Sequence, residues 1–138
     1  MVAGDRTIYC TAVPIKPGLT ARVEMVVTEA DTAITLRSGD VPVLATPRVI
    51  ALCEQASCRV LDGLLGENET SVGMRVQIDH VQPAAVGATV RADATLEKVE
   101  GRRLTFIVNA HDARGLIAAG RVTRVIVDRD RFLEKTGN

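Results

Sequence analysis

Two side chains in this sequence could carry acid–base or nucleophilic chemistry: a glutamate inside an apolar helical segment and a histidine that ends an alternating strand. Glu54 has Ile50, Ala51, Ser57 and Cys58 three and four residues away, so no lysine or arginine pairs with it along a helix. A carboxylate in such an apolar setting suits a general base or a nucleophile. A solvated helix face is the other interpretation of Glu54, and the sequence leaves both open.

The histidine is His80, which follows Val76 and Ile78 at two-residue spacing. Period 2 places its side chain on their buried strand face, toward the helix. A lone histidine on such a face is more often a hydrogen-bonded core residue than a catalyst. Because the side chains of Glu54 and His80 are both predicted to point into the same interior, a functional site there is favoured. His111 alternates with the outward set of its own strand, and we exclude it.

Two further residues lie close to this pair along the chain. Thr46 and Pro47 open the predicted helix as N-cap and first helical residue. N-capping alone accounts for Thr46. An unbroken helix separates it from Glu54 by about 12 Å along the axis, too far for a direct hydrogen bond, so the two could share a site only through a substrate, His80 or a later helix start. Gly73 falls on the outward set of an alternating strand, where glycine marks either a bulge or the close approach of a ligand or backbone.

The remaining candidate residues give weaker evidence of a reaction or a binding site. The hairpin 101–103, Gly-Arg-Arg, could meet a phosphate, although a solvated turn is the favoured interpretation. Cys10, Cys53 and Cys58 show no nucleophile pattern and are expected to be free thiols. With two histidines and no CxxC, we expect no metal site. There is no P-loop or dinucleotide fingerprint, and we expect no cofactor.

Composition excludes several partners. The 138 residues hold 17 Lys plus Arg and 17 Asp plus Glu, so the zero net charge provides no field to collect nucleic acid or anionic lipid. Aromatic residues make up 2%, too few for base-stacking platforms. No apolar run approaches the roughly 18 residues of a membrane span. We therefore expect a cytoplasmic protein that binds neither nucleic acid nor membrane.

The elements that must position the candidate residues are one strand, one helix and four further strands. A polar, turn-rich stretch at 31–40 follows the first strand. Apolar residues surround most of the helix, so other elements must enclose it. The inward face of the last strand changes near Gly120, which predicts a bulge or bend there. The expected strands are 19–27, 72–79, 90–97, 104–111 and 116–127, and the helix runs from 46 to near 63.

This order predicts an α+β fold in which a curled antiparallel sheet wraps around one central helix. We expect a single domain over 1–138, with a core at about 19–127 and a charged, peripheral tail at 128–138. Apolar residues alternate with polar ones so that only one face of each strand is apolar. The sheet edges and outer faces therefore stay available to a second subunit. The sequence therefore predicts a homodimer.

The chain resembles the hotdog-fold thioesterases related to fluoroacetyl-CoA thioesterase. The resemblance runs from about Ala21 to Phe132 and covers most of the chain. Its residues are Ala45 and Thr46 at the helix start, Glu54 within the helix, Gly73 to His80 on the next strand, Val99 to Leu104, and Ala110 to Asp112.

The resemblance implies a homodimeric enzyme that hydrolyses a small acyl-CoA thioester, with coenzyme A as part of the substrate and no metal. It places a Thr/Glu/His triad on Thr46, Glu54 and His80, and it lets Gly73 lend a backbone group to substrate binding. Glu54 is then a nucleophile or the base that activates water, while the histidine handles protons and the threonine orients them.

Two departures from the family accompany the resemblance. The fluoroacetyl-specific enzyme has a phenylalanine-bearing lid before the triad threonine, whereas residues 38–44 contain no aromatic residue, which argues against selectivity for a fluorinated acyl group. Pro47 stands where we expect glycine. The alternative function is a non-catalytic protein of the same fold that binds acyl-CoA or another hydrophobic ligand. Hydration of an enoyl-CoA is a third hypothesis, for which we find no motif.

Overall fold

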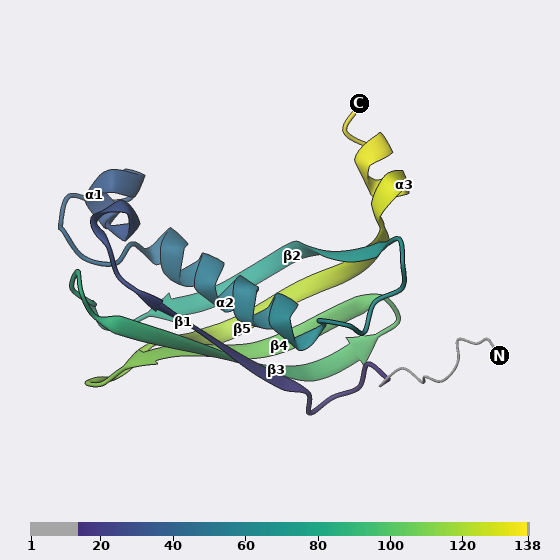
Figure 1. The fold of residues 1–138 in the computed structure, drawn as a ribbon, viewed down its shortest axis with the longest axis horizontal. Coiled ribbons are helices and arrows are strands. Elements are labelled where there is room, and N and C mark those ends of the chain that lie inside the picture. The colour runs from purple at the N-terminus through teal and green to yellow at the C-terminus, as the bar shows by residue number, and fades with distance from the viewer. Residues whose placement is uncertain (1–13, 138) are drawn as a thin grey trace.

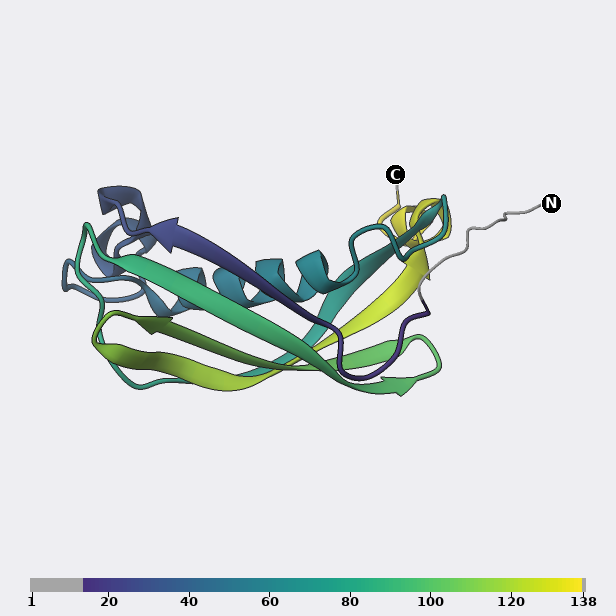
Figure 2. The same ribbon diagram turned by 60° about the horizontal axis from the view of Figure 1, so that its bottom comes forward.

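One long helix lies across one face of a five-stranded antiparallel sheet, and none of the helices within residues 14–137 covers the opposite face (Figure 1, Figure 2). The computed structural model describes residues 14–137. The expected curled sheet around a single long helix is present, and the sheet does not close. The elements are β1 (Thr20–Val26), η1 (Glu29–Asp31), α1 (Ala33–Leu36), α2 (Thr46–Val60), β2 (Glu69–His80), β3 (Thr89–Glu100), β4 (Arg103–Asp112), β5 (Gly115–Asp128) and α3 (Arg129–Glu134).

The strands follow the spatial order β1-β3-β4-β5-β2, and every neighbouring pair is antiparallel. Consecutive strands β3, β4 and β5 are joined by short turns, as the sequence predicts. β2 pairs with β5 on one side and forms an edge of the sheet, and β1 forms the other edge. The strand that carries Gly73 and His80 therefore has one side with which no strand of the described chain pairs, and we call it the free side of β2.

The core lies between α2 and the inner face of the sheet. Alternate residues of β3 and β4 are buried, and so is the side of α2 that faces them. Each large apolar side chain buried in this way contributes about 1.5–3 kcal/mol. The largest fully buried side chains include Leu52, Leu96, Leu104, Phe106 and Val108.

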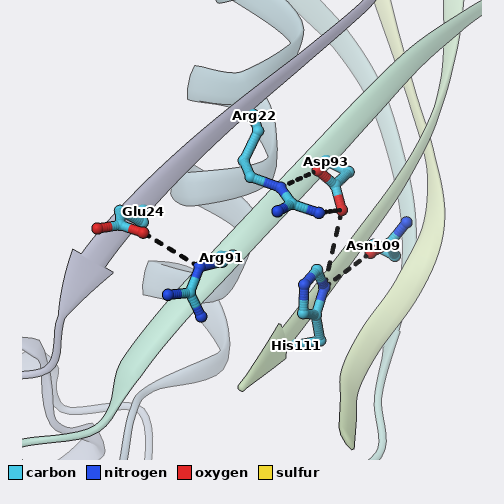
Figure 3. A network of polar contacts seen from close by, with 6 residues as sticks. All are labelled: Arg22, Glu24, Arg91, Asp93, Asn109 and His111. Carbon is cyan, nitrogen blue, oxygen red and sulfur yellow. Dashed lines mark hydrogen bonds and ion pairs between the residues drawn. The ribbon is translucent and has the colours of Figure 1, made fainter. Parts of the chain in front are cut away.

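The outer face of β1, β3 and β4 carries a ladder of polar side chains (Figure 3). Arg22 donates to Asp93 across 2.6 Å, and this hydrogen bond holds the pKa of the Asp93 carboxyl below its ordinary value. His111 lies on the same face, with its Nδ1 3.3 Å from Asn109 Oδ1 and 3.8 Å from Asp93 Oδ2. The prediction that His111 faces away from α2 is confirmed.

Two segments differ from the expected loops. The stretch at 31–40, expected to be turn-rich, contains α1, and η1 ends at its first residue. Thr32 caps α1 through a hydrogen bond from the Thr35 N–H. The charged tail contains α3, where Asp128 accepts a hydrogen bond from the Arg131 N–H at 3.0 Å. α3 projects beyond the end of β5 (Figure 1). None of the helices in the described part of the chain is long and apolar enough to cross a membrane.

Candidate active site

Thr46 is not the N-cap of α2. Ala45 takes that position with an extended backbone, Thr46 is the first helical residue, and Pro47 follows it. Because the cap is one residue earlier, the Thr46 hydroxyl does not cap the helix. It lies 2.7 Å from Nδ1 of His80, at the end of β2. The predicted role of Thr46 as a cap is therefore wrong, and its hydroxyl is available for a different contact.

His80 points toward α2, as the period-2 pattern predicts. Its Nε2 atom is buried and has no hydrogen-bond partner among residues 14–137. When the ring carries its proton on Nε2, Nδ1 accepts a hydrogen bond from the Thr46 hydroxyl. In the other tautomer, Nδ1–H donates a hydrogen bond to the same oxygen. In both tautomers the Thr46 hydroxyl is the hydrogen-bond partner of the ring. Thr46 itself is exposed, so this pair connects the ring to the surface.

Glu54 lies two helical turns beyond Thr46 on α2, with its side chain about one-third exposed (33%). As expected, Glu54 has no cationic neighbour along the helix, but in the folded chain Arg124 approaches it from β5. Nη1 of Arg124 reaches Oε2 of Glu54 from β5 at 3.2 Å. The other carboxylate oxygen, Oε1, has no hydrogen-bond partner in the described chain. One oxygen is thus anchored and the other is free to meet a ligand or water.

Arg124 is a functional candidate that our sequence analysis missed. Its side chain is 9% exposed, and Ser71 fixes it at two points: Nε donates to the hydroxyl at 2.8 Å and Nη2 to the backbone oxygen at 2.9 Å. A signal was present in the sequence. Val122 and Ile126, two residues before and after Arg124, are both buried on the inner face. An arginine between two inward apolar residues must find a partner inside.

Gly73 lies directly against the Glu54 carboxylate. A Cβ atom at position 73 would stand 2.6 Å from Oε2 of Glu54 and 3.6 Å from Nη1 of Arg124. The pairing with β5 shifts between Gly73 and Arg75, so Met74 is an extra residue in β2. The prediction that Gly73 faces outward is wrong, because this bulge changes the phase and lets both Gly73 and His80 face α2.

One chain therefore holds two separate groups. Thr46 and His80 form the first; Glu54, Gly73 and Arg124 form the second. Eight residues of helix place the two groups about 12 Å apart along the axis. The structure does not bring the three triad candidates together within a single chain.

The neighbouring thiol does not supply a nucleophile. Cys53 precedes Glu54 and is fully buried. Burial and the adjacent Glu54 charge raise the pKa of the Cys53 thiol to about 11, which keeps it protonated at neutral pH. Cys58 is an exposed free thiol, and Cys10 lies outside the described residues. Across residues 14–137, no cluster of three or more His, Cys, Asp or Glu side chains could hold a metal ion.

Comparisons with known proteins agree with this fold and show the family. Residues 27–130 match the family FlK, fluoroacetyl-CoA-specific thioesterase. The fluoroacetyl-CoA thioesterase of Streptantibioticus cattleyicolor is 34% identical over 93 residues, which is 67% of each chain.

Two solved structures are also similar. A phenylalanine-to-alanine mutant of the fluoroacetyl-CoA-specific thioesterase, in complex with fluoroacetate and CoA, has a TM-score of 0.81 at 29% identity, over 86% of this chain and 99% of that one. A thioesterase superfamily member from Thermus thermophilus has a TM-score of 0.82 at 34% identity, over 89% and 91% of the two chains.

The fold and these matches define a hotdog-fold thioesterase, an enzyme class that hydrolyses thioesters. The chain belongs to the fluoroacetyl-CoA-specific thioesterase family. The resemblance found in the sequence is confirmed, and so is the assignment as a thioester hydrolase. The hypothesis of a non-catalytic binding protein is not supported.

Proposed function

We propose that this enzyme hydrolyses the thioester of a small acyl-CoA with Thr46, Glu54 and His80 as its catalytic residues. The observation that carries the proposal is the anchoring of Glu54. A carboxylate held by a buried arginine at one oxygen, and free at the other, presents a fixed base or nucleophile. Coenzyme A enters only as part of the substrate.

The chemistry follows from the two groups. Oε1 of Glu54 takes a proton from water as the water oxygen attacks the thioester carbonyl carbon, or it attacks that carbon itself. The carbon–sulfur bond then breaks, and the leaving thiolate takes up a proton. If Glu54 made the attack, water next hydrolyses the acyl–Glu54 anhydride and restores the carboxylate. The Thr46–His80 pair, joined at 2.7 Å, can relay that proton from Glu54 or solvent, so that the hydroxyl regains the proton that it passes on. The backbone of Gly73 lies beside Glu54 and can bind the thioester carbonyl oxygen as that oxygen gains negative charge.

We place the substrate among small acyl-CoA esters without selectivity for fluoroacetyl. In support, a relative's structure holds fluoroacetate and CoA, while residues 38–44 of this chain have no aromatic side chain. Apart from Val43 and Leu44, these residues are exposed. A lid that lacks an aromatic ring has less surface with which to discriminate one short acyl group from another.

The test is release of free thiol from a panel of acyl-CoA esters, short to long and including fluoroacetyl-CoA. We expect turnover by the wild type on short esters. Because a positioned acid or base contributes about 10²–10⁴-fold, Glu54→Gln and His80→Ala should each lower kcat by at least about 100-fold. His111→Ala, on the outer face, is the matched control and should keep wild-type kcat. Wild-type turnover by Glu54→Gln would exclude this site.

We also propose that the enzyme works as a homodimer joined through the free side of β2. Three exposed apolar residues support this: Met74 (48% exposed), Val76 (37%) and Val81 (56%) lie on this strand or directly after it. An edge strand with exposed apolar residues is a ready template for pairing with a second copy. Because Thr46 and Glu54 are too far apart in one chain, we propose that Glu54 of one copy acts with the Thr46–His80 pair of the other.

A further inference from the structure

A cavity of about 200 Å³ opens on the outer face of the sheet, and neither the fold nor the proposed active site gives it a role. Two threonines that pair in register lie in its lining, Thr105 of β4 and Thr123 of β5. Thr105 also pairs with Lys98 of β3, and Thr123 with Arg75 of β2, so four lining residues form one row across four strands. Because Phe106 is buried on the inner face, the residue before it and its row face away from α2 (Figure 2).

Arginines flank this row on both sides. Arg103, from the hairpin 101–103 that could meet a phosphate, comes two residues before the threonine of β4, and Arg121 comes two residues before the threonine of β5. Because β4 and β5 are antiparallel, the two arginines lie on opposite sides of the row. With the lysine and the arginine of the row, the lining holds four cationic side chains and one carboxylate, Glu100. The whole chain has zero net charge, so this cavity is a local concentration of positive charge.

Most of these cations have no hydrogen-bond or ion-pair partner for their side chains within residues 14–137, namely Arg75, Lys98 and Arg103. Arg121 is paired, because its Nε and Nη2 donate to the two carboxylate oxygens of Glu97 at 2.9 and 3.1 Å. That hydrogen bond, and to a smaller extent the charge of Lys98, hold the pKa of the Glu97 carboxyl below its ordinary value. Elsewhere on the outer face, the arginines drawn in Figure 3 each meet a carboxylate. The cavity therefore gathers cations that are available to an anion.

A buried hydroxyl points to a ligand independently of these charges. Thr123 is only 9% exposed, it lines the cavity, and its hydroxyl makes no hydrogen bond within residues 14–137. Burial of a hydroxyl without a partner costs free energy, and valine would fill the same strand position without that cost. An anion in the cavity would accept a hydrogen bond from this hydroxyl and from that of Thr105 beside it, which also has no partner in the described chain.

We propose that this cavity binds a multivalent, phosphate-type oxyanion. Ammonium and guanidinium groups only donate hydrogen bonds, and threonine hydroxyls can donate too, so the lining suits a ligand that only accepts. The donors come from beneath, from both ends of the row and from both of its sides, which matches the tetrahedral oxygens of phosphate better than a flat carboxylate. The volume is below the range of about 300–1,000 Å³ of drug-sized ligands and suits one or two phosphate groups. Inorganic phosphate, pyrophosphate and the diphosphate of ADP all present this chemistry.

The cavity is separate from the site proposed for the thioester. Glu54 lies on the inner face, beside Gly73 and Arg124, whereas the cavity faces the other way. Thr123 is next to Arg124 along β5, so one layer of backbone separates the anion from the candidate active site. A second copy joined edge to edge at the free side of β2 leaves the outer face open. We therefore expect the anion and the thioester to bind without competing.

Isothermal titration calorimetry at fixed ionic strength measures the Kd of the full chain for phosphate, pyrophosphate and ADP, with acetate as a monovalent carboxylate. We expect one bound anion per chain, the tightest of the three phosphate compounds to identify the source, and no binding of acetate. Because a charge-assisted hydrogen bond to phosphate is lost, Arg75→Gln and Arg103→Gln should each raise that Kd about tenfold. Arg114→Gln is the matched control and should keep the wild-type Kd, because Arg114 is also exposed, has no side-chain partner in the described chain and lies outside this cavity.

Thr123→Val tests the buried hydroxyl. The substitution keeps the branched shape and removes the donor, so the Kd should rise about tenfold. The free energy of unfolding, measured by urea denaturation, should stay the same or increase, which separates lost binding from lost folding. Thr123→Ser keeps the hydroxyl and should bind the anion with near wild-type affinity.

The KM for acetyl-CoA separates this cavity from a site for the substrate's own phosphate groups, and Arg75→Gln should leave that KM unchanged. The proposal is overturned if the KM rises together with the Kd, if no phosphate compound binds the wild type, or if acetate binds as tightly. It is also overturned if Arg75→Gln and Thr123→Val change the Kd no more than Arg114→Gln does. The titrations do not depend on the proposed function, so they still decide the proposal if the wild type releases no thiol from acetyl-CoA.

Discussion

Arg124 and Gly73 determine where the Glu54 carboxylate lies. Arg124 holds one oxygen at 3.2 Å, and the missing side chain at position 73 provides the space that the same oxygen occupies. Neither contact can be derived from the spacing of residues along α2, because both partners come from strands far away in the sequence. Positioning by neighbours of this kind is what a fixed base or nucleophile requires.

Gly73→Ala tests this positioning. The new Cβ would stand 2.6 Å from Oε2 of Glu54, so the carboxylate must move while the backbone stays in place. Since a misplacement of about 1 Å can cost roughly 100-fold in rate, we expect kcat/KM to fall by about two orders of magnitude. The free energy of unfolding should change by less than about 1 kcal/mol. Steady-state kinetics and urea denaturation measure the two effects.

The double variant Gly73→Ala/Glu54→Gln is the control for this prediction. If Gly73 acts only through Glu54, the double variant should be no slower than Glu54→Gln alone. Fully additive losses would show that Gly73 has a role independent of the carboxylate.

At the scale of single residues, the sequence was enough to name most of the candidate residues, but it did not predict which other residues they contact. His80 faces α2 as expected, since period 2 holds from Val76 to His80. The role of Thr46 was mistaken because Thr-Pro is a typical N-cap pair, and only the backbone shows that Ala45 takes the cap. Arg124 was missed because an arginine in a strand is usually solvated.

At the scale of elements, β2 depends on its close approach to β5. A Cβ at Gly120 would overlap the Gln77 carbonyl oxygen and stand 2.7 Å from the Ile78 Cα. Both are backbone atoms, which cannot rotate away. Gly120 is therefore required for the pairing of the strand that carries Gly73 and His80.

Gly120→Ala should destabilise the protein because β2 must move as a unit to accept the methyl group. Overpacking against backbone costs about 1–3 kcal/mol, and we expect the free energy of unfolding to fall by that amount. Faster hydrogen exchange should be confined to β2 and β5. Ala119→Ser, one residue earlier, is the control and should stay within about 0.5 kcal/mol of the wild type. Unchanged stability of Gly120→Ala would contradict the close approach.

The sequence predicted the order and type of the main elements, because one-sided alternation is strong in β3, β4 and β5. It located the irregularities only approximately. The expected bulge near Gly120 lies three residues earlier, where the pairing passes from Ala118 to Leu116 and leaves Ile117 extra. A bulge was one of the two interpretations of Gly73, and it lies at the next residue, Met74, where the apolar–polar alternation of the sequence continues without a break. α1 and α3 are too short for a periodic signal.

At the scale of the whole molecule, the free side of β2 and the separation of the two catalytic groups have one common explanation. A sheet edge with exposed apolar residues invites a second copy. A triad split by about 12 Å within a chain can be completed by residues of another chain. Under this proposal each dimer has two sites, and each site uses Glu54 from one copy and Thr46 with His80 from the other.

Subunit complementation tests this arrangement. In a dimer of one Glu54→Gln chain and one His80→Ala chain, one site carries both changes and the other carries neither. Equal mixing makes half of the dimers mixed, so activity should return to about one quarter of the wild-type value. Each variant alone should remain inactive. Refolding from a urea mixture exchanges the chains, and light scattering with size-exclusion chromatography verifies the dimer. If mixed dimers form and stay inactive, each site lies within one chain, and the span between Thr46 and Glu54 must then be bridged by the substrate.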